Sequence, residues 1–292
     1  MNKAIPLCWL NGEIIPAEQA SIPVMDHALL YGDGVFEGIR FYNGKAFRLQ
    51  AHLNRLQDSA AVLRLQIPLT EEYMKKAIQD LIQSFEAPDG YIRLVVTRGD
   101  GPMGLDPAPC LQPRLFIIAA QLAYVDVESR TQGIRAVIAS TRRLQADGLD
   151  PRVKSLNYLN HILARTEANY AGAQEAILLN SLGNVAEGTA DNVFAVKDDK
   201  LFTPPVTDGA LDGVTRGLVI ELAEQLGLDV QEKTLAPYDL YTADECFLTG
   251  TGAELIPVRE IDGRPMKCCP GDIYKKLAQS FHKAIQRETQ AA

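Results

Sequence analysis

The sequence is poor in residues that hold metals or form disulfide frameworks. Its five cysteines, Cys8, Cys110, Cys246, Cys268 and Cys269, are odd in number, irregularly spaced and without a CxxC pair. This pattern argues against a disulfide framework or a zinc site, and it is typical of the reducing cytoplasm. The four histidines show neither HxH nor HExxH spacing, so we expect no metal and no histidine-based nucleophile triad.

Long apolar runs and basic blocks are also lacking. No stretch approaches the roughly 18 apolar residues of a membrane helix, and the N-terminus is not expected to be a signal peptide. The net charge of −8, without a cluster of Lys or Arg, makes nucleic acids and anionic membranes poor candidates as partners. The 292 residues, 47% hydrophobic and 23% charged, are ordinary for a globular enzyme of one large or two modest domains.

The residue pattern predicts a mixed α/β chain. Residues 4–48 read as strands and turns, because Asn11-Gly12 and Asn43-Gly44 each separate apolar runs and favour type I′ hairpin turns. We predict a small α/β domain at 1–120, a linker at 121–133 and a large domain at 134–292. Predicted helices are 49–65, 70–86, 157–171, 214–226 and 271–287; predicted strands are 91–97, 113–120, 133–141, 175–180 and 245–251, with a hairpin at 192–204.

Three glycine-containing segments could bind an anion. Gly32, Gly34 and Gly38 suggest a dinucleotide loop, but a strand and hairpin follow them instead of a helix, so we reject that interpretation. The segment 213–216 begins a predicted helix, where peptide N–H groups favour phosphate. The segment 250–252 ends a predicted strand and could form an anion nest. Taken alone, each is more simply explained as an ordinary turn or helix start.

Two charged residues, Lys154 and Glu187, could have chemical roles, although their local sequence is explained as well by ordinary structural roles. Lys154, in RVKSLNYLN, reads locally as a surface lysine, because a lysine becomes a nucleophile only when its pKa is lowered or its charge is masked. Glu187, in NVAEGTADNVF, reads locally as a cap or turn residue. Its alternative is a pairing with a buried cation.

Together these segments form an ordered set that resembles the class IV aminotransferases, the fold-type IV enzymes of pyridoxal 5'-phosphate (PLP). The match covers about residues 8 to 265. The resemblance implies two α/β domains with the cofactor in the cleft between them, and a homodimer or larger homo-oligomer. The motifs are DHALLYGDGVFEGIR (26–40), HLNRLQDSA (52–60), YIRLVVTRGDGPMGLDP (91–107), KSLNYLN (154–160), EGTADNVF (187–194), LDGVTRG (211–217) and TGTGAE (249–254).

The resemblance assigns roles to these residues. Lys154 would bind PLP covalently and move the proton at the substrate Cα. Glu187 would pair with the pyridine nitrogen and keep it protonated, so that the cofactor carries the electron chemistry without a metal. Tyr158 would hydrogen-bond the ring hydroxyl and Leu211 would pack on the ring face. The phosphate would be held by Arg55, Val214, Thr215 and Thr251.

Within the family, the chain is most similar to branched-chain aminotransferases, which exchange amino groups between leucine, isoleucine or valine and 2-oxoglutarate. Tyr31, Phe36 and Tyr124 would line the apolar pocket. Tyr91 and Arg93 match the YxR pair of these enzymes, and Arg93 would accept the acidic side chain of glutamate. The substrate α-carboxylate would bind the turn Thr251-Gly252-Ala253, in which Gly252 replaces the usual alanine.

Other functions remain as alternatives. Standard D-amino acid aminotransferases carry an Arg-x-His carboxylate trap where this chain has Met103-Gly104-Leu105, although Arg98 lies nearby in sequence. An aminodeoxychorismate lyase is less consistent, because EGTADNVF follows the aminotransferase form. A non-catalytic binding protein with this fold is disfavoured, because both Lys154 and Glu187 are retained.

Overall fold

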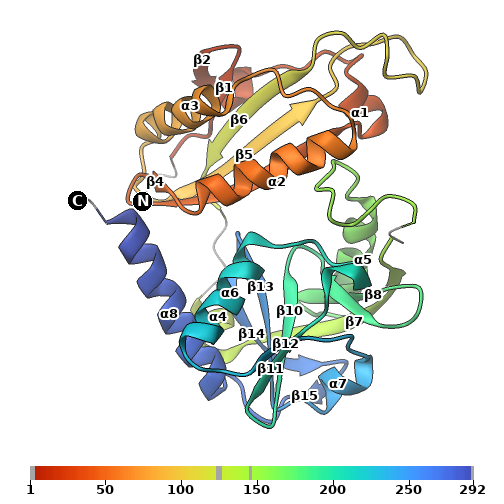
Figure 1. The fold of residues 1–292 in the computed structure, drawn as a ribbon, viewed down its shortest axis with the longest axis vertical. Helices are drawn as coiled ribbons and strands as arrows, with labels where there is room; N and C mark the ends of the chain where they lie inside the picture. Colours follow the sequence, from red (N-terminus) through yellow and green to blue (C-terminus); the bar gives the residue numbers. More distant parts are fainter. Residues whose placement is uncertain (1–3, 123–126, 145–146, 291–292) are drawn as a thin grey trace. The chain divides into compact units, whose positions relative to one another are not determined.

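The computed structural model describes residues 4–122, 127–144 and 147–290, which form two compact units (Figure 1). Unit 1 comprises Met1–Ala123, Val153–Asn157 and Ile285–Ala292, and unit 2 comprises Tyr124–Arg152 and Tyr158–Ala284. The segment that carries Lys154 therefore belongs to unit 1, although its neighbours in sequence belong to unit 2. The functional domain boundaries at residues 120 and 134 stay a prediction.

Unit 1 is built on a six-stranded antiparallel sheet. Both predicted Asn-Gly hairpins are confirmed: Asn11-Gly12 joins β1 to β2 and Asn43-Gly44 joins β3 to β4, with positive φ at all four residues. The strands, in the order β2-β1-β6-β5-β3-β4 across the sheet, are β1 (Leu7–Leu10), β2 (Glu13–Pro16), β3 (Gly34–Tyr42), β4 (Lys45–Ala46), β5 (Gly90–Thr97) and β6 (Arg114–Ala120).

Two amphipathic helices, α2 (Leu49–Val62) and α3 (Glu71–Ser84), cover one face of this sheet, as predicted (Figure 1). Their apolar side chains and those of the strands form a single buried core. The short helix α1 (His27–Tyr31) and the 3₁₀ turn η1 (Ala17–Gln19) lie where only strands and turns were predicted. Five residues are too few to show a helical period; α1 begins where the Asp26 carboxylate accepts the N–H of Ala28.

Unit 2 contains a nine-stranded mixed sheet. The predicted strands at 133–141, 175–180 and 245–251 and the hairpin at 192–204 are confirmed. Strand β7 runs parallel to both β8 and β14, and β11 runs parallel to β12. The strands are β7 (Ile134–Arg142), β8 (Glu175–Leu179), β9 (Val185–Gly188), β10 (Asn192–Lys197), β11 (Lys200–Thr203), β12 (Val230–Glu232), β13 (Glu245–Gly250), β14 (Glu254–Ile261) and β15 (Arg264–Pro265).

The helices of unit 2 include two that were not predicted, α4 and α7. Helix α4 (Val127–Gln132) lies inside the predicted linker and packs on β14; its short polar sequence gave no apolar period. Helix α6 ends as predicted before Gly227, whose φ is +70°. The others are α5 (Leu159–Tyr170), α6 (Val214–Gln225), α7 (Pro237–Tyr241) and α8 (Asp272–Thr289), with the 3₁₀ turn η2 (Val206–Asp208).

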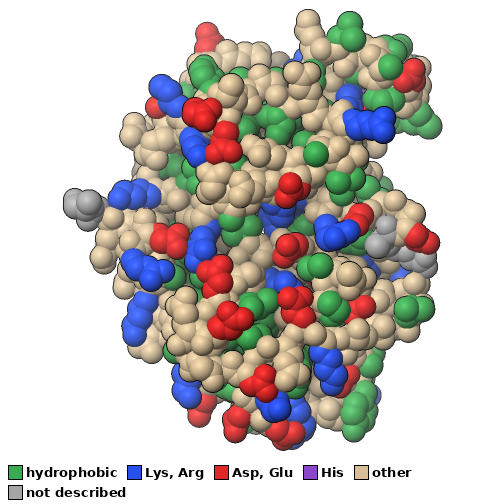
Figure 2. All heavy atoms as spheres, in the orientation of Figure 1, with side chains coloured by type: hydrophobic (Ala, Val, Ile, Leu, Met, Phe, Trp, Pro, Cys, Tyr) green, Lys and Arg blue, Asp and Glu red, His purple; other side chains and the backbone are tan. Residues whose placement is uncertain are grey.

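The surface carries charges of both signs. On the face drawn in Figure 2, Lys and Arg side chains are interspersed with Asp and Glu. Within the described ranges, no helix has the length and apolarity needed to cross a membrane. All five cysteines are free thiols, and Cys8, Cys110 and Cys246 are buried.

Candidate active-site residues

Lys154 is held against the edge of the unit 1 sheet. The main chain around it pairs with the start of β3: Phe36 donates its N–H to the Lys154 carbonyl at 3.0 Å, and Leu156 donates to Gly34 at 3.0 Å. The Lys154 N–H donates to the Ser59 hydroxyl of α2 at 3.1 Å. A strand and a helix distant in sequence therefore fix the backbone from which the amine extends.

The ring of Phe36 brings several predicted residues together. The Lys154 Nζ lies 4.6 Å from the ring centroid, and the Arg93 guanidinium lies 4.4 Å from it. Arg93 also lies 5.6 Å from the centroid of the Tyr91 ring. A Cβ atom on Gly38 would lie only 1.8 Å from the Tyr91 hydroxyl, so a larger residue there would displace the Tyr91 ring. The result is an aromatic surface with two cations above it.

Glu37 projects from β3 on the opposite side from Phe36, beneath α2, and it is fully buried. Arg55 donates to it twice, from Nε at 2.7 Å and from Nη2 at 2.8 Å, and His52 Nδ1 lies 2.8 Å from the same carboxylate. Burial alone would raise the pKa of Glu37, but the charge and hydrogen bonds of Arg55, assisted by His52, outweigh it and lower the pKa to about 2. Burial lowers the pKa of His52 despite the attraction of Glu37, so at neutral pH Glu37 is ionised and His52 is neutral.

Glu37 was missed in the sequence, although a signal for it exists. Its strand neighbours Val35 and Ile39 are core residues, and an acidic side chain with the same orientation needs a cationic partner. Arg55 supplies that partner with two of its five N–H groups. The role of Arg55 in phosphate binding stays a prediction.

Tyr31 lies near Met103 and Leu105, the two residues at the positions of the D-type carboxylate trap. The Tyr31 hydroxyl accepts the Gly104 N–H at 2.9 Å, and its ring packs edge-on against His27 at 5.0 Å. Met103 and Leu105, on either side of Gly104, are 79% and 82% exposed. Neither side chain can bind a carboxylate, as the sequence indicated.

Arg98, the alternative carboxylate anchor, has a structural role. It is buried and donates from Nε and Nη2 to Asp33 at 2.9 and 3.0 Å. It also donates to the backbone carbonyls of Arg64 and Leu63 at 2.9 and 2.8 Å. These four bonds use most of the donors of Arg98 within the protein, which argues against its use as a substrate anchor.

Glu187, on β9, is a buried carboxylate of unit 2. Arg143 Nε donates to its Oε1 at 2.7 Å, the Leu211 N–H donates to Oε2 at 2.8 Å, and His161 Nε2 lies 3.5 Å from Oε1. Burial would raise the pKa of Glu187, but the His161 hydrogen bond and the Arg143 charge outweigh it and lower the pKa. The carboxylate is ionised at neutral pH and, with about four lone-pair sites, can accept a further N–H.

Tyr158 connects to this carboxylate through His161. Tyr158 precedes α5, and its ring stacks on the His161 ring with the centroids 4.4 Å apart and the planes at 21°. His161 and Arg143 were not assigned from the sequence, because nothing local distinguishes them from ordinary helix and strand-end residues. Their partner lies 26 and 44 residues further along the chain.

The start of α6 has the features of an anion site. Gly213 occupies the N-cap position, and no side chain caps the helix. A Cβ on Gly213 would lie 2.0 Å from Asn192 Oδ1, and Asn192 Nδ2 donates to the Leu211 carbonyl at 2.9 Å. Val214 and Thr215 form the first turn, where peptide N–H groups and the helix dipole favour a phosphate.

The segment 251–253 is a three-residue turn between β13 and β14, closed by the pairing of Gly250 with Glu254. A Cβ on Gly250 would lie 2.1 Å from Asp191 Oδ1, so glycine permits the loop before β10 to approach this turn. The buried Thr249 hydroxyl has no hydrogen-bond partner in the part of the chain that the structure describes. Tyr124, the last predicted pocket residue, lies outside the described residues.

Comparison with known proteins decides the family. The model of the amino-transferase class IV family matches residues 34–261. This chain belongs to the class IV aminotransferases. Both the family resemblance and the fold-type IV class expected from the sequence are confirmed.

Similar proteins align with this aminotransferase over nearly its whole length. A putative branched-chain-amino-acid aminotransferase of Methanocaldococcus jannaschii is 51% identical over 94% of each chain. The branched-chain-amino-acid aminotransferase of Salmonella typhimurium is 39% identical over 99% of this chain and 96% of its own. The crystal structure of the Escherichia coli branched-chain amino acid aminotransferase has a TM-score of 0.93 at 38% identity, covering 98% of this chain and 96% of that one.

Proposed function

We propose that this aminotransferase exchanges the amino group between branched-chain L-amino acids (leucine, isoleucine and valine) and 2-oxoglutarate, with PLP as its cofactor. The observation that carries the proposal is the near full-length similarity to branched-chain aminotransferases, at 38–51% identity. One similar branched-chain aminotransferase structure is a complex with N-(5'-phosphopyridoxyl)-L-glutamate, and another contains pyridoxamine 5'-phosphate. This function is favoured over a D-amino acid aminotransferase or an aminodeoxychorismate lyase.

The donor groups of the chain fit PLP. Lys154 provides a partly buried amine for the cofactor aldehyde. Glu187 provides a buried, ionised carboxylate for the pyridine nitrogen, with acceptor sites left beyond Arg143 and the Leu211 amide. The start of α6 provides Val214 and Thr215 for the phosphate, which Arg55 and Thr251 would also bind. Tyr158 would bind the ring hydroxyl and Leu211 would contact the ring face.

Side chains of the protein would then control the proton on the substrate Cα and the charge on the pyridine nitrogen. PLP, when bound, withdraws electrons from the substrate Cα. Glu187 stays ionised because its pKa is lowered, so its charge favours a protonated pyridine nitrogen. With the cofactor bound, the Lys154 amine would move the proton between the substrate Cα and the cofactor carbon that carries the amino nitrogen. These steps require no metal.

Substrate selection is assigned to the aromatic surface around Phe36 and to the 251–253 turn. Phe36, Tyr31, Tyr91 and Tyr124 would contact the apolar side chain. Arg93, whose guanidinium lies over Phe36, would pair with the second carboxylate of glutamate or 2-oxoglutarate. The backbone at Gly252 and Ala253, with Thr251, would bind the α-carboxylate.

We further propose that the enzyme takes part in branched-chain amino acid biosynthesis in the cytoplasm as a homodimer or larger homo-oligomer. The five free thiols support a reducing compartment. On α5, Leu159, Ile162 and Leu163 share one helical face and are 74%, 56% and 57% exposed. Such an apolar stripe favours burial against another subunit. A monomeric mass in solution would contradict the assembly.

The covalent role of Lys154 tests the assignment. Lys154→Ala should lose the visible absorption band of bound PLP and nearly all turnover, because no amine remains for the aldehyde or for proton transfer. Lys76→Ala is the matched control, since Lys76 is exposed and pairs with Asp80 in the same helix. Full turnover by Lys154→Ala would refute the assignment.

A further inference from the structure

Glu254 adopts a backbone conformation that is unusual for its residue type. It is the first residue of β14, directly after the 251–253 turn, and its φ is +62°. Three-residue hairpin turns commonly need one residue in the left-handed region, where glycine or asparagine is preferred. A glutamate there is strained, and it persists only where its surroundings hold it in place.

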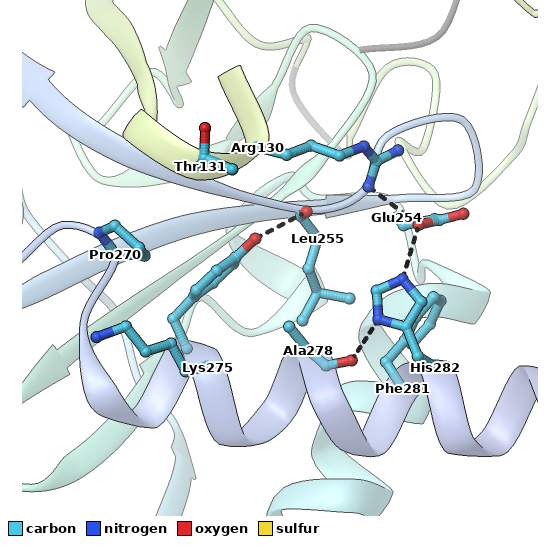
Figure 3. Close-up of a pocket in the computed structure, with 10 residues that line it drawn as sticks. Arg130, Thr131, Glu254, Leu255, Pro270, Lys275, Ala278, Phe281 and His282 are labelled. Atoms are coloured by element: carbon cyan, nitrogen blue, oxygen red, sulfur yellow. Dashed lines mark hydrogen bonds and ion pairs between the residues drawn. The ribbon is translucent and has the colours of Figure 1, made fainter. Parts of the chain in front are cut away.

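The Glu254 side chain makes the contacts that hold it. Its carboxylate is 8% exposed, and Arg130 Nη1 donates to Oε2 at 3.0 Å. His282 Nε2 lies 3.7 Å from the same oxygen. Figure 3 shows Arg130 and His282 pointing toward Glu254 from different elements, α4 and α8. A residue adjoining the turn is thereby tied to two helices.

The next residue is tied to α8 as well. The Tyr274 hydroxyl donates to the Leu255 carbonyl at 3.2 Å. Both residues line a cavity of about 360 Å³ between α4, β14 and α8, together with Arg130, Glu254 and His282. On the other side of the turn, Gly250 is fixed by its pairing with Glu254 and by the close approach of Asp191. The 251–253 turn is thus held at both ends.

We propose that Arg130, Glu254 and His282 are positioning residues that hold the 251–253 turn in the shape that binds the substrate α-carboxylate. The inference rests on the proposed function, which assigns the α-carboxylate to this turn. The network acts on the turn backbone, and its three side chains do not themselves bind the substrate. Loosening the network should therefore weaken carboxylate binding while leaving the chemistry at Lys154 intact.

The test compares carboxylate binding with reaction rate in Glu254→Gln and Arg130→Met. In the PLP-loaded protein, the dissociation constant of unreactive 4-methylvaleric acid is measured from its change to the cofactor spectrum. The saturating rate of the leucine half-reaction is measured in parallel. For both variants we expect the dissociation constant of 4-methylvaleric acid to be about tenfold larger than that of the wild type, equivalent to about 1.4 kcal/mol. The saturating rate of the leucine half-reaction should stay within roughly twofold of the wild type.

Two further variants separate positioning from general stability. Lys275→Met is the matched control, because Lys275 lines the same cavity but pairs with Asp272, and it should bind like the wild type. Arg130→Lys keeps the charge opposite Glu254 and should restore most of the affinity lost in Arg130→Met. If Glu254→Gln does not fold, the two Arg130 variants decide the question.

The proposal would be overturned if Glu254→Gln and Arg130→Met bound 4-methylvaleric acid as tightly as the wild type and differed only in a lower melting temperature. The network would then have a purely structural role. Equal loss in Lys275→Met would overturn it too. Failure of the proposed function is distinguishable, because the wild-type protein itself would then not react with leucine.

Discussion

Glu37 of unit 1 and Glu187 of unit 2 are each buried and paired with an arginine and a histidine, and the two clusters differ in how completely the carboxylate is used. Glu37 receives two hydrogen bonds from Arg55 and has His52 at 2.8 Å. Glu187 receives a hydrogen bond from Arg143 and one from a backbone amide, and its hydrogen bond with His161 is long, at 3.5 Å. The first carboxylate is enclosed by cationic and aromatic partners, and the second retains capacity for another donor.

This difference separates a carboxylate that orients a neighbour, Glu37, from one that we propose serves the cofactor, Glu187. Glu37, fully buried beneath α2, fixes the guanidinium of Arg55, a partly buried residue of α2 that is the predicted phosphate ligand. Glu187 stays ionised with fewer side-chain contacts, as a partner for a protonated ring nitrogen must. Replacing each glutamate should therefore affect different measurable quantities.

The largest expected effect follows from Glu187→Gln. An amide cannot supply the charge that favours a protonated pyridine nitrogen, so the half-reaction with L-leucine should slow by about 10³-fold. Single-turnover absorbance changes measure this rate, and a PLP titration verifies that the cofactor remains bound. A rate within tenfold of the wild type would remove the functional distinction between the two glutamates.

Glu37→Gln should affect stability and cofactor retention more than rate. Removing one partner of a buried ion pair leaves Arg55 without its counter-charge and should cost about 3–5 kcal/mol of the free energy of unfolding. Bound PLP should dissociate faster, while the leucine half-reaction at saturating PLP changes less than that of Glu187→Gln. Denaturant unfolding and dialysis against PLP-free buffer measure the two effects; unchanged PLP retention would contradict the orienting role.

The acid dependence of stability should reveal the same glutamate. Because the folded pKa of Glu37 is lowered from 4.5 to about 2, its contribution is fully present above about pH 5 and is lost as the pH falls toward 2. Glu37→Gln should therefore flatten the dependence of the unfolding free energy on pH between about 5 and 2. Parallel curves for the variant and the wild type would show that Glu37 does not titrate as expected.

A smaller effect, on substrate selectivity, is expected from Arg93 of β5, which lies with Phe36 on the opposite face of the sheet from Glu37. Arg93→Ala should weaken the use of glutamate and 2-oxoglutarate by about tenfold more than the use of leucine, because only the former carry a second carboxylate. The ratio of kcat/KM values for the two amino donors measures this selectivity. Equal losses for glutamate and leucine would assign Arg93 to packing on Phe36 instead.

Elements with a clear local period were predictable, and elements fixed by distant partners were not. The apolar face of α2 and the two Asn-Gly hairpins follow from residues adjacent in sequence. Helix α4 lacks such a pattern and forms where it packs on β14. The placement of Lys154 in unit 1 depends on pairing between residues 153–157 and β3, which is more than a hundred residues earlier.

The candidate site divides in the same way. Lys154 and Glu187 were identified because their motifs resemble those of a known family. Glu37, Arg143 and His161 were missed, because each is defined by a partner on another element. The hydrogen bonds from Arg98 to Asp33 could not be predicted from the sequence either, because they depend on the close approach of two separate loops.

The most direct test is the half-reaction of the purified, PLP-loaded protein with a single amino acid. L-leucine and D-alanine are mixed with it separately, and the visible absorption band of the cofactor is followed. We expect L-leucine to convert this band to that of the pyridoxamine form and D-alanine to leave it unchanged. Conversion by D-alanine alone would contradict the proposed L-amino acid specificity and would require a carboxylate anchor other than the 251–253 turn.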